Sequence, residues 1–188
     1  MGEGGPGEAW PASALWDYAV ALYATPGVAE CCLSLQDRCG VDVNLLLFAC
    51  WLGVIGQDPG PERLALVRRR AESWQEGLVR PLREARRRLK VELSTAAEPL
   101  RAPLTAARAG LAAAELALER GELLQIETSA AIPVAGVTGY GSAHAARMLR
   151  HLVALEPGDE PNLQALVAAA FPSGEGLGAV STEPVAGG

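Results

Sequence analysis

Aromatic residues are scarce in this 188-residue chain, where they make up 5% of the sequence. β-Branched residues are outnumbered by alanine and leucine, a balance that favours helices over strands. The apolar share of 49% and the charged share of 20% are typical of a folded protein and exclude an intrinsically disordered one. We therefore expect an all-α protein, and its length suits a single domain.

Positive charge is also in short supply. The net charge is −6, and Lys90 is the single lysine among sixteen basic residues, the others being arginine. An excess of negative charge excludes a general nucleic-acid binder held by phosphate neutralisation. No specific nucleic-acid binding is expected.

The chain has no long hydrophobic run and no export signal. Its longest uninterrupted apolar run covers residues 45–56, which is too short to span a bilayer at about 20 residues. Residues 1–11 contain Glu3 and Glu8 and no basic run before an apolar stretch, so they do not form a signal peptide. We expect a cytoplasmic protein with no membrane span and with reduced cysteines.

Motifs of known chemistry are missing as well. The four cysteines form no CxxC pair, and the sequence has no HExxH, GxSxG, Walker or GxGxxG motif. We therefore predict no catalytic residue, no cofactor and no metal site. This pattern favours a protein that is not an enzyme.

What is present is helical periodicity. Residues 13–24 and 26–39 show apolar spacing of three to four, and Asp42 can cap a third helix at residues 43–55. This third helix is apolar on nearly every face, which predicts that other helices surround it.

A longer apolar stripe runs from Leu64 to Ala96 and keeps its phase across Pro81. It predicts one long helix kinked at Pro81 and ended by Pro99 and Pro103. The next helix is expected at residues 103–120, with its apolar face on Leu104, Ala107, Leu111, Ala114 and Leu118 and its end at Gly121.

These elements predict an irregular single-domain bundle of about six to seven helices around the apolar helix at 43–55. The helical domain is expected to cover residues 13–171, with a flexible loop at 128–141 and C-terminal helices at 142–171. Residues 1–12 and 172–188 are rich in glycine and proline or in small residues and are expected to be disordered.

Five segments of the first half stand out: Trp16-Asp17-Tyr18, residues 23–28, Leu35-Gln36-Asp37, residues 41–48 and Trp51-Leu52-Gly53. Together they resemble a family of small proteobacterial proteins of unknown function, over about residues 13–120. The resemblance implies a bacterial, cytoplasmic protein and carries no activity, cofactor or catalytic residue.

One candidate site lies in the apolar first half. Gln36, Asp37 and Asn44 could line a cleft with walls of Trp16, Tyr23 and Trp51. The alternative is structural: Asp42 caps the third helix, while these polar side chains satisfy nearby backbone groups. This pocket, for a small ligand or an enzyme's substrate, is the second functional hypothesis.

The leading hypothesis is a non-enzymatic protein that binds an acidic protein partner. Residues 62–90 contain ten basic and four acidic side chains. At 100° per residue, five of the basic residues share one flank of the apolar stripe: Arg69, Arg80, Arg83, Arg87 and Lys90. The alternatives are a solvated helix face, contact with acidic segments of the same chain, and self-association.

Overall fold

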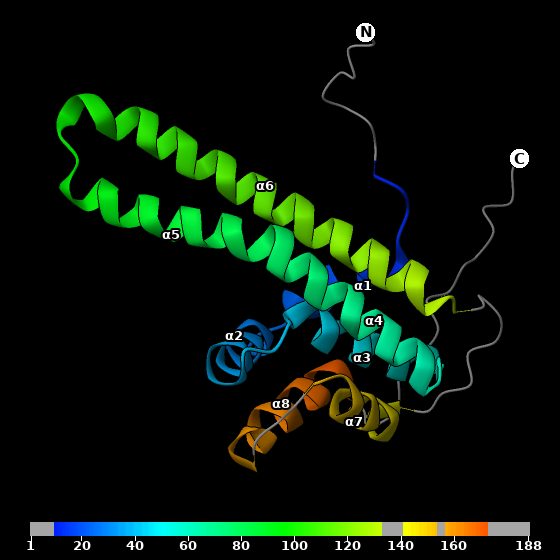
Figure 1. Ribbon diagram of the computed structural model, residues 1–188. Helices are drawn as coiled ribbons and strands as arrows, with labels where there is room; N and C mark the ends of the chain where they lie inside the picture. The colour runs from blue at the N-terminus through cyan, green and yellow to red at the C-terminus, as the bar shows by residue number, and fades with distance from the viewer. Residues whose placement is uncertain (1–9, 133–140, 154–156, 173–188) are drawn as a thin grey trace, which may run out of the picture.

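A computed structural model describes residues 10–132, 141–153 and 157–172, and every regular element in these ranges is helical (Figure 1). The all-α prediction is confirmed. The α-helices are α1 (Ala14–Tyr23), α2 (Val28–Cys39), α3 (Val43–Ile55), α4 (Pro61–Trp74), α5 (Arg80–Thr95), α6 (Glu98–Ala130), α7 (Gly141–Leu152) and α8 (Glu160–Ala170). Residues 1–9 and 173–188, where disorder is expected, lie outside the described residues.

Helix α3 is the centre of the fold, as its composition predicts. Every residue from 44 to 53 is buried, and α7 packs along it. Gly53 is required for that packing, because a Cβ at this position would lie 2.7 Å from the Cβ of Ala145. The Asp42 side chain accepts a hydrogen bond from the backbone N–H of Asn44 at 2.9 Å and caps the helix, as expected.

The long helix predicted across Pro81 is continuous but is not regular. Between α4 and α5 the five residues Gln75–Val79 form a π-helical turn, so the irregularity lies just before Pro81 and not at it. The N–H of Arg80 bonds to the carbonyl of Gln75, five residues back. A wider turn relieves the clash that a proline ring would make with the carbonyl four residues before it.

Helix α6 is much longer than the sequence suggests. Pro99 lies in its first turn, Pro103 and Gly121 lie inside it, and it ends at Ala130, so the predicted helix at 103–120 is wrong at both ends. Gly121 does not end the helix; its missing side chain lets α6 pack closely against α4. A Cβ there would lie 3.0 Å from the Trp74 ring of α4.

The apolar face expected on α6 is also shifted. Ala107 and Ala114 are exposed, whereas Glu115 and Glu122 are buried together with Leu123. The face that α6 turns to the core therefore includes two carboxyl groups.

Helices α5 and the first half of α6 form a two-helix arm that projects from the other helices (Figure 1). No residue of α5 is fully buried. The base of the arm, where α6 packs against α1 and α3, is the region of interest for function.

The predicted loop at 128–141 begins later than expected. Residues 128–130 belong to α6, and α7 begins at Gly141, while residues 133–140 lie outside the described residues. Within the described part of the chain, no single helix is both long and apolar enough to cross a membrane. Helices α1 and α2 reach that length and composition only together, across a bend of 99°.

Candidate functional site

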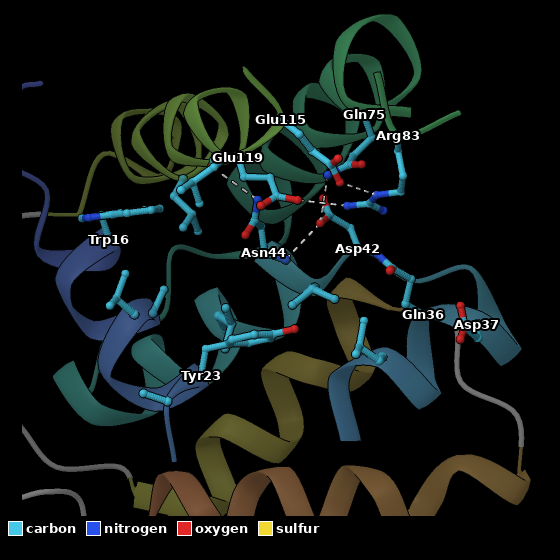
Figure 2. A pocket seen from close by; sticks show the side chains of 18 of the residues that line it. Trp16, Tyr23, Gln36, Asp37, Asp42, Asn44, Gln75, Arg83, Glu115 and Glu119 are labelled. Atoms are coloured by element: carbon cyan, nitrogen blue, oxygen red, sulfur yellow. Dashed lines mark hydrogen bonds and ion pairs between the residues drawn. The ribbon is translucent and has the colours of Figure 1, made fainter. Parts of the chain in front are cut away.

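A pocket with a volume of about 660 Å³ opens where α1, α2 and α3 meet the base of the arm. Volumes of this size are typical of small-molecule sites, which range from about 300 to 1,000 Å³. The pocket draws residues from α1, α2, the start of α3, the π-helical turn, α5 and α6 (Figure 2).

The mouth of the pocket is apolar and exposed. Val20 (49% exposed), Tyr23 (37%), Leu33 (47%) and Leu116 (57%) all line it. They account for four of the eight large hydrophobic side chains that are exposed among the described residues. Such a concentration at one opening differs from the scattered apolar residues that any surface carries.

The inner end of the pocket is polar. Asp42, Asn44, Gln75, Arg83 and Glu119 converge there from the start of α3, the π-helical turn, α5 and α6 (Figure 2). The capping role of Asp42 places its carboxyl group at this end, because an N-cap residue directs its side chain over the first turn of the helix.

Glu122 lies behind this inner end and is completely buried. Its Oε2 accepts hydrogen bonds from Asn44 Nδ2 and from Gln75 Nε2, both at 2.7 Å. Gln75 Nε2 also lies 3.3 Å from Asp42 Oδ1. Gln75 therefore bridges the carboxyl groups of Asp42 and Glu122, and Asn44 bonds to Glu122 through its side chain and to Asp42 through its backbone N–H.

The pKa values of both carboxyl groups are raised. Burial raises the pKa of Glu122, and the Coulombic repulsion and hydrogen bond of Asp42 raise it further, to about 9. Burial also raises the pKa of Asp42, while hydrogen bonds from Glu122 and the Asn44 backbone partly offset this rise. Glu122 therefore holds the proton at neutral pH and donates it to Asp42, since two adjacent buried carboxylates cannot both ionise.

A second group of charges closes the side of the pocket that faces the arm. Arg83 donates to Glu115 and to Glu119, both at 3.0 Å, and Arg86 donates to Glu115 at 2.6 Å. Burial alone would raise the pKa of Glu115, but the hydrogen bonds from Arg86 and Arg83 lower it below its ordinary value. These bonds join α5 to α6 at the base of the arm.

Five of the six residues expected to line a pocket do so: Trp16, Tyr23, Gln36, Asp37 and Asn44. Gln36 and Asp37 line the pocket from α2, and Asp37 lies further than Gln36 from the converging polar groups (Figure 2). Trp51 does not line the pocket; it is buried in the core beside Phe48. It shares a helix face with Asn44 but lies two turns further on, about 10 Å along α3.

The expected partner surface is divided. Arg83 and Arg87 line the pocket, and Arg83 bonds to carboxylates of the same chain. Arg80 pairs with Glu76 at 3.7 Å. Arg69 and Lys90 are exposed on α4 and α5. Arg80 and Arg83 of this flank contact acidic groups of the same chain, which is one of the alternative interpretations of this arginine-rich surface.

The sequence did not point to Gln75, Arg86, Glu115, Glu119 or Glu122 as site residues. A signal was present for the three glutamates, because their spacing of four and then three puts them on one face of a helix. Within the described residues, no group of three or more histidine, cysteine, aspartate or glutamate side chains is arranged to hold a metal ion.

The fold and the site together define an all-helical protein with a notable pocket among the described residues. The opening of this pocket is apolar, and a pair of buried carboxyl groups lies at its inner end. Residues 14–126 match the family described as "Protein of unknown function (DUF2390)", and the chain belongs to this family. No curated protein and no solved structure matches the chain. Every pocket-lining residue, and Glu122 behind them, falls within the matched segment.

Proposed function

We propose that this protein binds a small amphipathic molecule in the pocket between α1, α2, α3 and the base of the arm. The apolar part of the ligand lies against the exposed mouth residues, and its polar part reaches the inner end near Asp42 and Asn44. The observation that carries the proposal is the gathering of exposed apolar side chains over buried polar groups in a cavity of ligand size.

A thermal-shift screen of metabolites tests this proposal. A true ligand should raise the melting temperature of the natural protein and have no effect on Leu116→Trp, in which a larger ring at an exposed position obstructs the mouth. Val91→Trp is the matched control, because Val91 is also an exposed apolar residue of the arm but does not line the pocket. A broad library without a ligand that follows this pattern would overturn the proposal.

An acidic protein partner on Arg69, Arg80, Arg83, Arg87 and Lys90 is the competing proposal. It has less support, because Arg80 and Arg83 already face carboxylates of the same chain. Charge reversal by Arg69→Glu and Lys90→Glu distinguishes the partner proposal from the pocket proposal, because neither residue lines the pocket. The double variant should lose a partner complex and keep the binding of a pocket ligand unchanged.

We also propose that the protein acts in the cytoplasm. The support is chemical: Cys31, Cys32 and Cys50 are free thiols, the form that a reducing compartment maintains.

A further inference from the structure

The short segment that leads into α1 is docked on α6 (Figure 1). The Trp10 ring lies so close to Gly121 that a Cβ at this glycine would be 3.6 Å from Trp10 Cη2. Three residues further on, the Ser13 hydroxyl donates to the Glu127 carboxylate at 2.5 Å and accepts the backbone N–H of Trp16 at 3.0 Å. The segment is therefore attached to α6 at two points.

Arg120 of α6 links this segment to the pocket. Its guanidinium carbon lies over the Trp16 ring, 5.0 Å from the ring centre, and over the Trp10 ring, 5.5 Å from the ring centre. Both distances are within the range of a cation–π interaction, which extends to about 6 Å. Trp16 lines the pocket and Trp10 does not. Through Arg120, Trp10 is therefore one side chain removed from the pocket wall.

The two indole rings are the contacts that orient the Arg120 side chain. Its Nε is buried and has no hydrogen-bond acceptor, and no ion pair joins the guanidinium to a carboxylate of the described residues. Burying such a group is costly, so the π-faces must offset part of the lost hydration. Trp10 is the ring that can leave most readily, because it is 42% exposed and precedes the first helix.

We infer that Trp10 and Arg120 are positioning residues for the pocket. This inference rests on the proposed pocket function and concerns the regulation of that site. While Trp10 is docked, Arg120 stays over the Trp16 ring and fixes this part of the wall. When Trp10 leaves α6, water reaches Arg120, and the guanidinium is free to turn away from Trp16. Ligand binding and docking of the segment before α1 therefore favour each other.

Fluorine NMR of the full chain labelled with fluorotryptophan tests this link without a ligand. Each of the four tryptophan signals is assigned by a single replacement with phenylalanine. Trp10→Ala and Arg120→Met should each shift the Trp16 signal. In the Arg120→Met background, Trp10→Ala should cause no further shift, because Arg120 carries the effect. An unchanged Trp16 signal in Trp10→Ala would overturn the inference.

Leu100→Ala is the matched control for the loss of an exposed apolar side chain. Leu100 is 55% exposed at the start of α6 and does not line the pocket. The variant should leave the Trp16 signal in place. A shift equal to that of Trp10→Ala would mean that the signal reports a general loss of stability, and this result would contradict the inference.

Binding of Nile red, an uncharged fluorescent dye, tests the effect on the pocket itself. Trp10→Ala should weaken dye binding about threefold or more, as expected for the loss of one cation–π contact. Trp10→Phe should restore the affinity, because a phenyl ring keeps an aromatic face for Arg120, and Leu100→Ala should bind the dye like the natural protein.

The Leu116→Trp variant separates failure of the inference from failure of the pocket proposal. If Leu116→Trp blocks the dye but Trp10→Ala binds it as tightly as the natural protein does, the inference is wrong and the pocket proposal stands. If the dye does not bind, or if Leu116→Trp leaves its binding unchanged, the result counts against the pocket proposal, and the inference falls with it.

Discussion

The carboxyl groups of Asp42 and Glu122 lie within hydrogen-bonding reach of each other, although one caps α3 and the other belongs to α6. Asn44 and Gln75 hold them in place through hydrogen bonds to Glu122 Oε2. This pair forms the inner end of the pocket, and it has consequences for stability that can be measured without a ligand.

Stability should fall as the pH rises from about 5 to 9. Burial and the neighbouring Asp42 raise the pKa of Glu122 to about 9, above its ordinary value of 4.5, so the folded protein holds a proton that the unfolded chain has lost. The contribution is complete below the unfolded pKa and disappears as the pH rises through the folded one. Urea denaturation at pH 5, 7 and 9 measures it.

Glu122→Gln removes this titration. Relative to the natural protein, the variant should gain about 1 kcal/mol or more in free energy of unfolding between pH 5 and pH 9. Glu84→Gln, an exposed change on α5, should instead follow the natural protein at every pH. Parallel pH profiles for Glu122→Gln and the natural protein would show that no proton is held at this position.

Gln75→Leu should lower the free energy of unfolding by about 1 to 3 kcal/mol, because both carboxyl groups lose a buried donor. Gln164→Leu is the matched control. Gln164 is exposed on α8 and does not line the pocket, so this change should cost less than about 0.5 kcal/mol. Similar losses for the two variants would mean that Gln75 has no special role at the pair.

Replacing two glycines of α6 by alanine should change the stability of the protein in opposite directions. Gly110→Ala meets no atom within 4 Å and should stabilise the protein by about 0.5 to 1 kcal/mol through helix propensity. Gly121→Ala should destabilise it, because the new Cβ presses on the Trp74 ring, whose indole N–H bonds to the Leu118 carbonyl at 3.0 Å. Thermal unfolding of the two variants is the test; an equal gain at both positions would rule out close packing at Gly121.

Arg83→Met should lower the free energy of unfolding by about 1 to 3 kcal/mol. The Arg83 side chain is only 18% exposed and bonds to two carboxylates of α6; in the variant Glu119 loses its partner and Glu115 keeps only Arg86. Arg88→Met breaks the exposed pair with Glu84 and should cost at most about 0.5 kcal/mol. If both changes cost the same in urea denaturation, the bonds that join α5 to α6 do not stabilise the arm.

The sequence predicted local features of the fold well. The apolar character of residues 43–55 and the capping ability of Asp42 are properties of short segments, and both were found as expected. The ends of α6 could not be predicted in this way. Pro103 and Gly121 are helix breakers by local propensity, yet α6 continues through both. At Gly121 the close approach of the Trp74 ring of α4 accounts for the glycine inside the helix.

The pocket was predicted in part. Trp16, Tyr23 and Asn44 lie near one another because α1 and α3 pack together, and apolar patterning indicates such packing. The inner end was not predicted, because Glu122 and Gln75 are brought to Asp42 only by the long-range placement of α6 and of the π-helical turn. No property of either segment alone shows that a glutamate there is completely buried.

The most direct test of the central claim is an NMR titration that follows the side-chain amide signals of Asn44 and Gln75. These amides hold the carboxyl pair at the inner end of the pocket. A ligand from the thermal-shift screen should shift both signals together with the backbone signals of Val20, Leu33 and Leu116 at the mouth. Unchanged Asn44 and Gln75 signals, with shifts confined to α7 and α8, would contradict the claim that this pocket is the binding site.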